Sequence, residues 1–460
     1  MSQFLSPGVY IREISGFRPI EGVGTAVAAF VGVARAGPVN EAKEITSWRQ
    51  FTNVFGELVG NERQPFVTGG YLAHAVRGFF LNGGTRCYVV NVGVDGGAAT
   101  PATDADTSTT SSGDADAGDS TPDGEPGESS PSPSTRRRRT GTSVARAETP
   151  LPVHATPTEL VGSSADRTGV SGLEAVDEVT MICVPDLMTA RDGVDGQELA
   201  TAQRDIIAQC ERLGDRVAIV DPPPDLDAQQ VREWRQAAGF DSSFGALYWP
   251  WLEVANPQAA NGNGEPKTIL VPPSGHLAGI WARVDGSRGV HKAPANEQIH
   301  GIVGLATQVT RAEQDGLNPL GVNCLRTFPG TGTRVWGART LSSTDSSWRY
   351  LNVRRLFNYL EESILEAMQW VVFEPNDRVL WAKIRRQVGS FLVNVWRTGA
   401  LFGSTPDEAF YVKCDDETNP QEGIEAGEVV CEIGVAAVKP AEFIVFQLHQ
   451  LPTGVSVIAE

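Results

Sequence analysis

Two aspartates of this 460-residue chain occupy positions at which α/β proteins place functional groups. Asp186 and Asp221 both follow apolar runs that are typical of buried strands, and the carboxyl ends of parallel strands meet at one edge of a sheet. The candidate histidines further along the chain are His276, His291 and His300. These residues could supply the base and the orienting acid of a Ser/His/Asp triad.

A catalytic serine is what this set lacks. Ser274 lies close to His276, but no serine lies in a G-x-S-x-G or GTSMA-like context. Both aspartates precede turns or prolines, where aspartate is also common for structural reasons. The sequence therefore favours an inactive interpretation and predicts that the chain is not an enzyme.

Cofactor and metal signatures are equally scarce. Gly83-Gly84 and Gly330-Thr331-Gly332 are predicted to be tight turns, and no Walker, HExxH or Rossmann pattern is present. The six cysteines form no CxxC pair and no Cys/His cluster: Cys87, Cys183, Cys210, Cys324, Cys414 and Cys431. We predict free buried thiols, no zinc and no cofactor.

One set of charged side chains is more suggestive. A helix is predicted over residues 377–398, with an apolar stripe of Leu380, Ile384, Val388, Phe391 and Val395. Four basic residues fall on its opposite side: Arg378, Lys383, Arg386 and Arg397. They form either a solvated face or a binding face, and the pattern alone does not favour one of the two.

The stretch 321–373 positions this helix. Two β-rich runs, 322–328 and 333–341, flank a glycine turn. They are followed, before the 377–398 helix, by another predicted helix. The apolar stripe of that helix comprises Val353, Leu356, Phe357, Leu360, Ile364, Met368 and Val371, and the residues predicted on its opposite side are Arg355, Glu362 and Glu366. Residues 374–377 are predicted to end it and to cap the next helix.

The remaining pattern predicts an α/β protein with an α+β last third. Short apolar strands are predicted at 25–33, 86–92, 179–184, 217–220, 244–254 and 268–271, and helices at 47–55, 65–82 and 199–213, with a short one around 231–234. Near-continuous apolar strands between helices indicate a mostly parallel sheet covered on both faces. Three further strands are predicted at 410–414, 429–436 and 442–448.

Composition narrows the function. With 56 acidic against 38 basic residues, the net charge is −18, which argues against coating nucleic acid. No run of about 18 apolar residues and no basic leader followed by an apolar core occur, so we expect folding in the cytoplasm and no membrane insertion.

A low-complexity segment interrupts the chain. From Gly96 to Ser143 there is no Leu, Ile, Val, Met, Phe, Tyr or Trp, so little in this stretch can offset the entropy of ordering. We predict a disordered insert over 96–172. Its run Arg136–Arg139 is more often a solvated patch than a nucleic-acid or localisation signal.

The first eighteen residues are predicted to be an extended arm. Val9, Ile11 and Glu13 alternate with Tyr10, Arg12 and Ile14, as in a strand. A solitary strand needs a partner, which is either the chain's own sheet or a second subunit.

Several long segments resemble the tail sheath proteins of contractile phage tails and related injection systems. They read SPGVYIREI near the start, and later FPGTGTRVWGARTL, WRYLNVRRLFNYLEESI, FEPND, LWAKIRRQVGSFL, GALFGSTPDEAFYVKCD and GVAAVKPAEFIVF. The resemblance implies a non-catalytic, subtilisin-like α/β domain, an α+β sheath domain and extended terminal arms. The expected boundaries are 1–20 (arm), 21–95 (first part of the core), 96–172 (insert), 173–345 (α/β domain) and 346–460 (sheath domain, with a terminal strand or tail at 441–460).

The resemblance also implies a function. Sheath subunits polymerise as helically stacked hexameric rings around an inner tube, contact baseplate and terminal cap proteins, and contract to drive the tube through a target membrane. Strand exchange between subunits would involve Val9, Tyr10, Ile11, Arg12, Phe443, Val445, Phe446, Val455 and Val457, and the inner tube would contact the basic residues of the 377–398 helix. The alternative is a subtilisin-type hydrolase embedded in an assembly protein.

Overall fold

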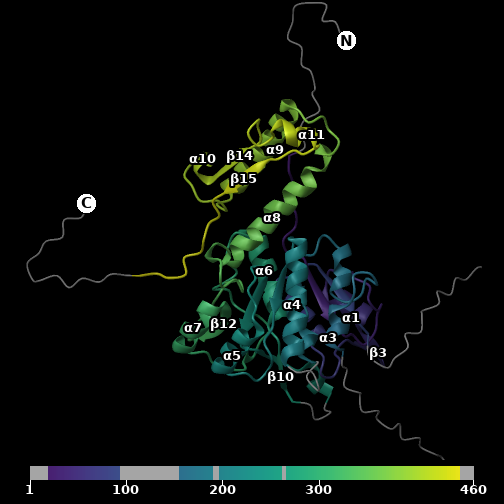
Figure 1. Ribbon diagram of the computed structural model, residues 1–460. Helices are drawn as coiled ribbons and strands as arrows, with labels where there is room; N and C mark the ends of the chain where they lie inside the picture. Colours follow the sequence, from purple (N-terminus) through teal and green to yellow (C-terminus); the bar gives the residue numbers. More distant parts are fainter. Residues whose placement is uncertain (1–18, 94–154, 190–195, 262–265, 446–460) are drawn as a thin grey trace, which may run out of the picture. The chain divides into compact units, whose positions relative to one another are not determined.

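A computed structural model describes residues 19–93, 155–189, 196–261 and 266–445 (Figure 1). Within these residues, one sheet has the strand order β13-β12-β8-β7-β6-β1-β5-β2. Neighbours from β12 to β5 are parallel, and β13 and β2 add antiparallel edges. The strands are β1 (Ala28–Gly32), β2 (Lys43–Ile45), β5 (Cys87–Asn91), β6 (Met181–Cys183), β7 (Val217–Val220), β8 (Gly245–Trp249), β12 (Val322–Phe328) and β13 (Gly332–Val335). The predicted parallel α/β sheet is confirmed.

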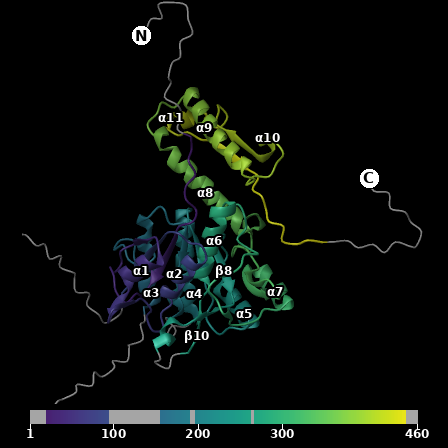
Figure 2. The same cartoon turned by 180° about the vertical axis from the view of Figure 1, so that it is seen from behind.

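Helices cover both faces of this sheet because its strands are apolar on both faces. Ala28 and Phe30 belong to one core, and Ala29 and Val31 to the other. The first core includes residues of α1 (Trp48–Phe55), α2 (Leu72–Leu81) and α6 (Ser274–Arg288). The second includes residues of α3 (Pro157–Val161), α4 (Gly196–Leu213), α5 (Ala228–Ala238) and α7 (Arg311–Leu317). Figures 1 and 2 show these layers from opposite sides.

Sequence reasoning missed α6. A helix buried on nearly all sides has no amphipathic stripe, and its first nine residues are all buried. Two of its glycines allow α2 to approach closely: a Cβ at Gly275 would overlap Ala75, and a Cβ at Gly279 would overlap the Phe79 carbonyl. The signal was therefore the glycine spacing rather than hydrophobic periodicity.

The predicted insert is too long at its C-terminal end. Residues 155–172 are folded: α3 begins with a capping box between Thr156 and Glu159, and Leu160 and Val170 are buried in the second core. The earlier part of the predicted insert lies outside the described residues.

Two smaller sheets flank the large one. The first has the order β10-β9-β11 (Thr268–Val271, Leu252–Ala255, Gly304–Leu305), and the second pairs β3 with β4 (Glu57–Val59, Glu62–Gln64). The predicted strand 244–254 is therefore two strands, β8 and β9, with Pro250 between them.

The C-terminal third forms a separate core. It comprises α8 (Leu351–Ala367), α9 (Arg378–Arg397), α10 (Pro406–Ala409), α11 (Gln421–Glu425) and the hairpin of β14 (Phe410–Lys413) with β15 (Glu432–Val435). The predicted strand 442–448 is wrong for residues 442–445, which have no regular secondary structure. Glu442 is held instead by an ion pair with Arg339 at 2.6 Å.

The predicted placement of Arg355 on the polar side of α8 is also wrong. Its side chain is 4% exposed and forms a bidentate ion pair with Asp285 of α6, with N–O distances of 2.5 and 3.0 Å. The same guanidinium donates to the Thr25 carbonyl at 3.0 Å and lies 4.7 Å from the centre of the Trp281 ring. Arg355 therefore joins three segments that are distant in the sequence.

Residues 20–23 also contact α8, at Tyr359 and Ser363. The Val23 N–H donates to Ser363 Oγ at 3.1 Å, and a Cβ at Gly22 would overlap the Tyr359 ring. Ile20 packs into the core of the C-terminal third. The chain thus contacts α8 before it enters β1.

We predict that Arg355→Met lowers the free energy of unfolding by about 3–5 kcal/mol at pH 7, because it leaves the buried Asp285 unpaired. Burial raises the pKa of Asp285 above its ordinary value, and Arg355 opposes that shift. Without Arg355 the folded-state pKa rises further, so the folded state favours the protonated carboxyl. The loss should therefore be smaller at pH 4, near the unfolded-state pKa of about 3.9, and should grow as the pH rises.

Urea titration of both proteins at pH 4 and pH 7 measures this difference. Arg349→Met, at an exposed position just before α8, is the matched control and should change stability by less than about 0.5 kcal/mol. Equal losses for the two variants would contradict the assigned role of Arg355.

Candidate functional site

The orientation of α9 is fixed by its cap and its apolar stripe. The Asp377 carboxylate accepts from the Val379 and Leu380 N–H groups at 2.9 and 2.8 Å, so the helix begins where the sequence predicts. The stripe is buried: Leu380, Ile384, Val388, Phe391 and Val395. The opposite face of α9 is consequently left outside the core.

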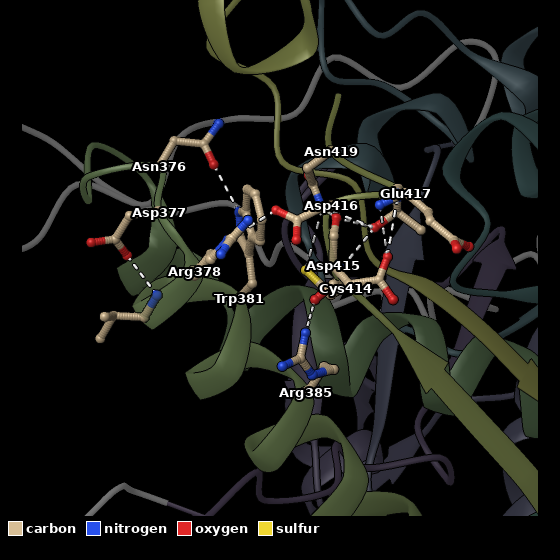
Figure 3. Close-up of polar contacts among 12 residues, drawn as sticks. Asn376, Asp377, Arg378, Trp381, Arg385, Cys414, Asp415, Asp416, Glu417 and Asn419 are labelled. Carbon is tan, nitrogen blue, oxygen red and sulfur yellow. Dashed lines mark hydrogen bonds and ion pairs between the residues drawn. The ribbon is translucent and has the colours of Figure 1, made fainter. Parts of the chain in front are cut away.

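The four basic residues lie on this outer face. Arg378, Arg386 and Arg397 are exposed, and Lys383 is half-buried. Arg378 forms an ion pair with Asp416 at 3.0 Å, but the two side chains are 80% and 65% exposed (Figure 3). Such a pair is worth at most about 1 kcal/mol, so a charged partner could displace it.

Three exposed apolar residues lie in the first turn of α9 or in the segment just before it, and sequence reasoning missed them. Val372, Phe373 and Val379 are 63%, 102% and 61% exposed. Phe373 has a φ of 69°, a left-handed conformation that is rare for a bulky residue. Aromatic residues and arginine are both enriched at protein interfaces. The only signal in the sequence was an aromatic residue placed directly before the helix-ending Glu374-Pro375.

Asn419 holds the loop after β14 against Val430, two residues before β15. Figure 3 shows Asn419 beside Cys414 and Asp415. Asn419 is 3% exposed, accepts from the Val430 N–H at 2.6 Å and donates to the Val430 carbonyl at 3.0 Å. It also donates to the Asp415 carbonyl at 3.1 Å. From α9, Arg385 donates to the carbonyl of Cys414. These contacts attach the hairpin to α9.

The hairpin offers an open edge. Among the described residues β14 pairs only with β15, in a register that places Phe410 opposite Val435. An unpaired edge presents N–H and C=O groups to another strand. Tyr411 on β14 is 53% exposed.

Of the residues predicted for strand exchange, only Phe443 and Val445 are described. They are 73% and 80% exposed, and Ile444 between them is 73% exposed. Val9, Tyr10, Ile11, Arg12, Phe446, Val455 and Val457 lie outside the described residues. An apolar run with this exposure has little contact within its own subunit.

The residues considered for a triad are not assembled into one. The Asp186 carboxylate accepts from three backbone N–H groups, those of Val33, Tyr71 and Leu72, at 2.5–3.1 Å. Asp221 accepts from the Ser274 N–H at 2.9 Å. Within the described residues, the Nδ1 of His276 is buried without a hydrogen-bond partner, so no carboxylate binds this atom as a triad requires.

The electrostatics of these buried groups fit a structural role. Burial raises the pKa of Asp186 to about 6, opposed by its three N–H donors, and raises the pKa of Asp221 to about 7, opposed by the side chain and the N–H of Ser274. Burial lowers the pKa of His276 to about 4. His291 and His300 contribute main-chain contacts, to Asn352 and Asn82 respectively. The hydrolase alternative is not supported.

One pocket of about 590 Å³ lies beside α8. Its lining includes five carboxylates, from Asp177, Glu178, Asp215, Glu362 and Glu366. Burial and the neighbouring acids raise the pKa of Glu362. This acidic lining differs from the mostly apolar lining of small-molecule sites.

Two other features are absent from the part of the chain that the structure describes. No group of three or more His, Cys, Asp or Glu residues could hold a metal ion there. No described helix is both long and apolar enough to span a membrane. All six cysteines are free; Cys431 is half-buried and the other five are buried.

Comparisons with known proteins agree with one another. Residues 168–341 match the phage tail sheath protein central domain, and residues 343–450 match the phage tail sheath C-terminal domain. The tail sheath protein of Vibrio phage KVP40 is 29% identical over 249 residues, which are 50% of this chain and 36% of that protein. This chain therefore spans only about a third of that relative's length.

Several solved structures resemble the chain over nearly its whole length. The sheath of the extracellular contractile injection system PVC, in its contracted state, has a TM-score of 0.64 and 28% identity, covering 98% of this chain and 99% of that one. A chain of the six-fold symmetrised baseplate of the anti-feeding prophage has a TM-score of 0.62 and 27% identity, covering 97% and 99%.

We predict that Asn419→Ala lowers the free energy of unfolding by about 2–4 kcal/mol, because it removes the hydrogen-bond partners of the Val430 N–H and C=O groups. Asp416→Ala, three residues away, removes only the exposed ion pair and should cost less than about 0.5 kcal/mol. Urea titration gives both values, and hydrogen exchange of residues 414–431 locates the change. Equal values would contradict the role assigned to Asn419.

Proposed function

Because the chain belongs to the phage tail sheath family, we propose that it is the structural subunit of a contractile sheath, part of a phage tail or a phage tail-like particle. The observation that carries this proposal is the match over 98% of the chain to a sheath in its contracted state. The two family matches add independent support, since together they cover residues 168–341 of the α/β part and residues 343–450 of the C-terminal third.

The subunit polymerises with itself, as helically stacked hexameric rings around an inner tube. Similarity to a chain of a six-fold symmetrised baseplate supports the ring symmetry and an association with baseplate proteins. Inner tube and terminal cap proteins complete the set of partners. Assembly takes place in the cytoplasm, without nucleic acid and without membrane insertion.

Contraction is not enzymatic. The energy is stored in the contacts between subunits during assembly and is released when the lattice becomes shorter and wider. The α/β part has a subtilisin-like topology without the catalytic function. This proposal is supported by the parallel sheet and by the backbone contacts that occupy Asp186 and Asp221.

Strand exchange links the subunits. The open edge of β14 and the exposed run Phe443–Val445 are the two complementary halves of such a link. Strand addition uses main-chain hydrogen bonds, so an extended apolar segment of one copy satisfies the edge of another. The N-terminal arm 1–20 and the tail 441–460 are the exchanged segments, and Ile20 packs in the same core as the hairpin.

The outer face of α9 contacts the inner tube. Its basic residues Arg378, Lys383, Arg386 and Arg397 fit an acidic tube surface. The exposed Val379 of the same helix, with Val372 and Phe373 just before it, would supply the apolar area that gives an interface its affinity. An exposed Phe in a left-handed conformation gains nothing for folding, which supports a role in binding.

We predict that the purified chain forms long hollow cylinders in negative-stain electron micrographs. The variant Val9→Pro with Ile11→Pro should remain a folded monomer, because proline removes N–H donors from the exchanged strand. The matched control, Val9→Ala with Ile11→Ala, keeps those donors and should form cylinders.

Two outcomes contradict different parts of this account. A discrete particle that cleaves peptides would overturn the sheath assignment. Cylinders from the double proline variant would show that the N-terminal arm is not the link, while leaving the sheath assignment intact.

We predict that Arg386→Glu with Arg397→Glu gives a soluble subunit that no longer assembles on the tube, because its outer face then repels an acidic surface. The control reverses the same two charges on the α/β part, at the exposed Arg232 and Lys267. Each double variant should change stability by less than about 1 kcal/mol. Microscopy of each variant co-expressed with the tube protein gives the result, and normal tube-filled particles from Arg386→Glu with Arg397→Glu would assign this face to solvent.

A further inference from the structure

Cys414 and Cys431 face each other across the C-terminal hairpin. The register of β14 and β15 places Lys413 opposite Glu432, and one further step along the ladder places Cys414 opposite Cys431. Side chains of directly opposite residues project from the same face of a sheet. Consistent with this, both cysteines lie at the same core, Cys414 within it and Cys431 packed against it.

The hydrogen-bond alternation of the ladder makes this pair suitable for a disulfide. The Ala436 N–H donates to the Ala409 carbonyl at 2.8 Å, so residues 409 and 436 form a hydrogen-bonded pair. Pairs of the two types alternate, which makes 414 and 431 a non-hydrogen-bonded pair, with an expected Cα separation of about 4.5 Å. Disulfides span Cα separations of about 4.4–6.8 Å.

The surrounding contacts keep the two residues in place. Asn419 donates to the Cys414 sulfur at 3.8 Å and binds both main-chain groups of Val430, the residue next to Cys431. Arg385 binds the Cys414 carbonyl from α9, as Figure 3 shows. Both cysteines are therefore held in place by neighbouring residues before a disulfide forms.

The chemistry of the thiols is that of a reduced, protonated pair. Burial raises the pKa of Cys414, while hydrogen bonds from Asn419 and Cys431 and the nearby Arg385 charge lower it. Burial, followed by the adjacent Cys414, raises the pKa of Cys431 to about 12. Both thiols are protonated at neutral pH, so the pair reacts slowly with disulfides, and the half-buried Cys431 is the more accessible member.

The remaining four cysteines lack such a partner. Cys87 and Cys183 lie on β5 and β6, which are separated by β1 and are therefore about 9.6 Å apart in the sheet. Cys210 lies in α4, and Cys324 lies on β12. Among the described residues, Cys414 and Cys431 are the two cysteines that a strand register, extended by one step, places directly opposite each other.

We propose that Cys414 and Cys431 are a redox modification site, at which a reversible intramolecular disulfide closes the β14–β15 hairpin. A thiolate of the pair attacks a small-molecule disulfide such as oxidised glutathione, forming a mixed disulfide and releasing one glutathione thiolate. The second cysteine, after losing its proton, attacks the mixed disulfide at the protein sulfur and releases the second glutathione. The protein loses two electrons and two protons, and the oxidant becomes two thiols.

The bond restrains the hairpin whether or not the chain is assembled. It closes a loop of fewer than twenty residues, the range in which a disulfide lowers the entropy of the unfolded chain appreciably. The hairpin is also the element with the open edge. Oxidation therefore makes that acceptor edge more rigid after the subunit has folded in a reducing environment.

The test maps the thiols of the full chain after oxidation. The purified protein is held with oxidised glutathione, denatured, alkylated with iodoacetamide and digested without reduction, and its peptides are identified by mass spectrometry. A linked peptide pair containing Cys414 and Cys431 is expected, with the other four cysteines alkylated. Alkylation of all six, linkage of either residue to another cysteine, or a link between two chains would overturn the proposal.

Two variants distinguish the bond from general effects of oxidation. Cys431→Ala should lose the linked peptides, whereas the matched control Cys210→Ala should keep them. A reductant should lower the midpoint of thermal unfolding of the oxidised wild type and of Cys210→Ala by several degrees, and should leave Cys431→Ala unchanged. Equal shifts in all three proteins would contradict a stabilising bond in the hairpin.

Discussion

The buried ion pair between Arg355 and Asp285 is the contact on which the described architecture depends. One guanidinium holds α6 from the α/β part, α8 from the C-terminal third and the segment that leads into β1. Leaving a buried charge without its partner lowers the free energy of unfolding by several kcal/mol. The ion pair therefore holds these segments together in addition to their apolar contacts. Under the proposed function, in which force passes from subunit to subunit, such a joint would keep the α/β part and the C-terminal third together.

The surfaces that we propose for assembly have few contacts within the described residues of the subunit. The parallel sheet is covered by helices on both faces, and its aspartates bind backbone N–H groups. In contrast, the β14 edge, the run Phe443–Val445 and the outer face of α9 have few contacts within the described subunit. Exposed apolar groups and an open strand edge are liabilities in a monomer, but each is a binding element in a polymer. Under the proposed function, the C-terminal third would supply most of the connections between subunits.

Local sequence patterns predicted most of the helices and strands. They failed where contacts between distant segments determine which side chains are buried or paired. The apolar strands, the Asp377 cap and the two faces of α9 could all be predicted, because each follows from spacing within one element. The α6 helix could not be predicted from a hydrophobic stripe, since α2 and the sheet bury both of its sides. Arg355 was predicted to be exposed because nothing near it in sequence reveals Asp285, 70 residues away. The Cys414–Cys431 pair likewise depends on a register that spacing alone does not give.

Cryo-electron microscopy of one particle before and after contraction tests the central claim most directly, because a contractile sheath must change its lattice while its subunits remain intact. The account predicts six-fold cylinders that become shorter and wider, with the Arg355–Asp285 pair and the β14–β15 register preserved in both states. Strand links between copies should also persist. Cylinders of a single fixed length, or a contraction in which the subunit itself unfolds at the Arg355–Asp285 contact, would contradict it.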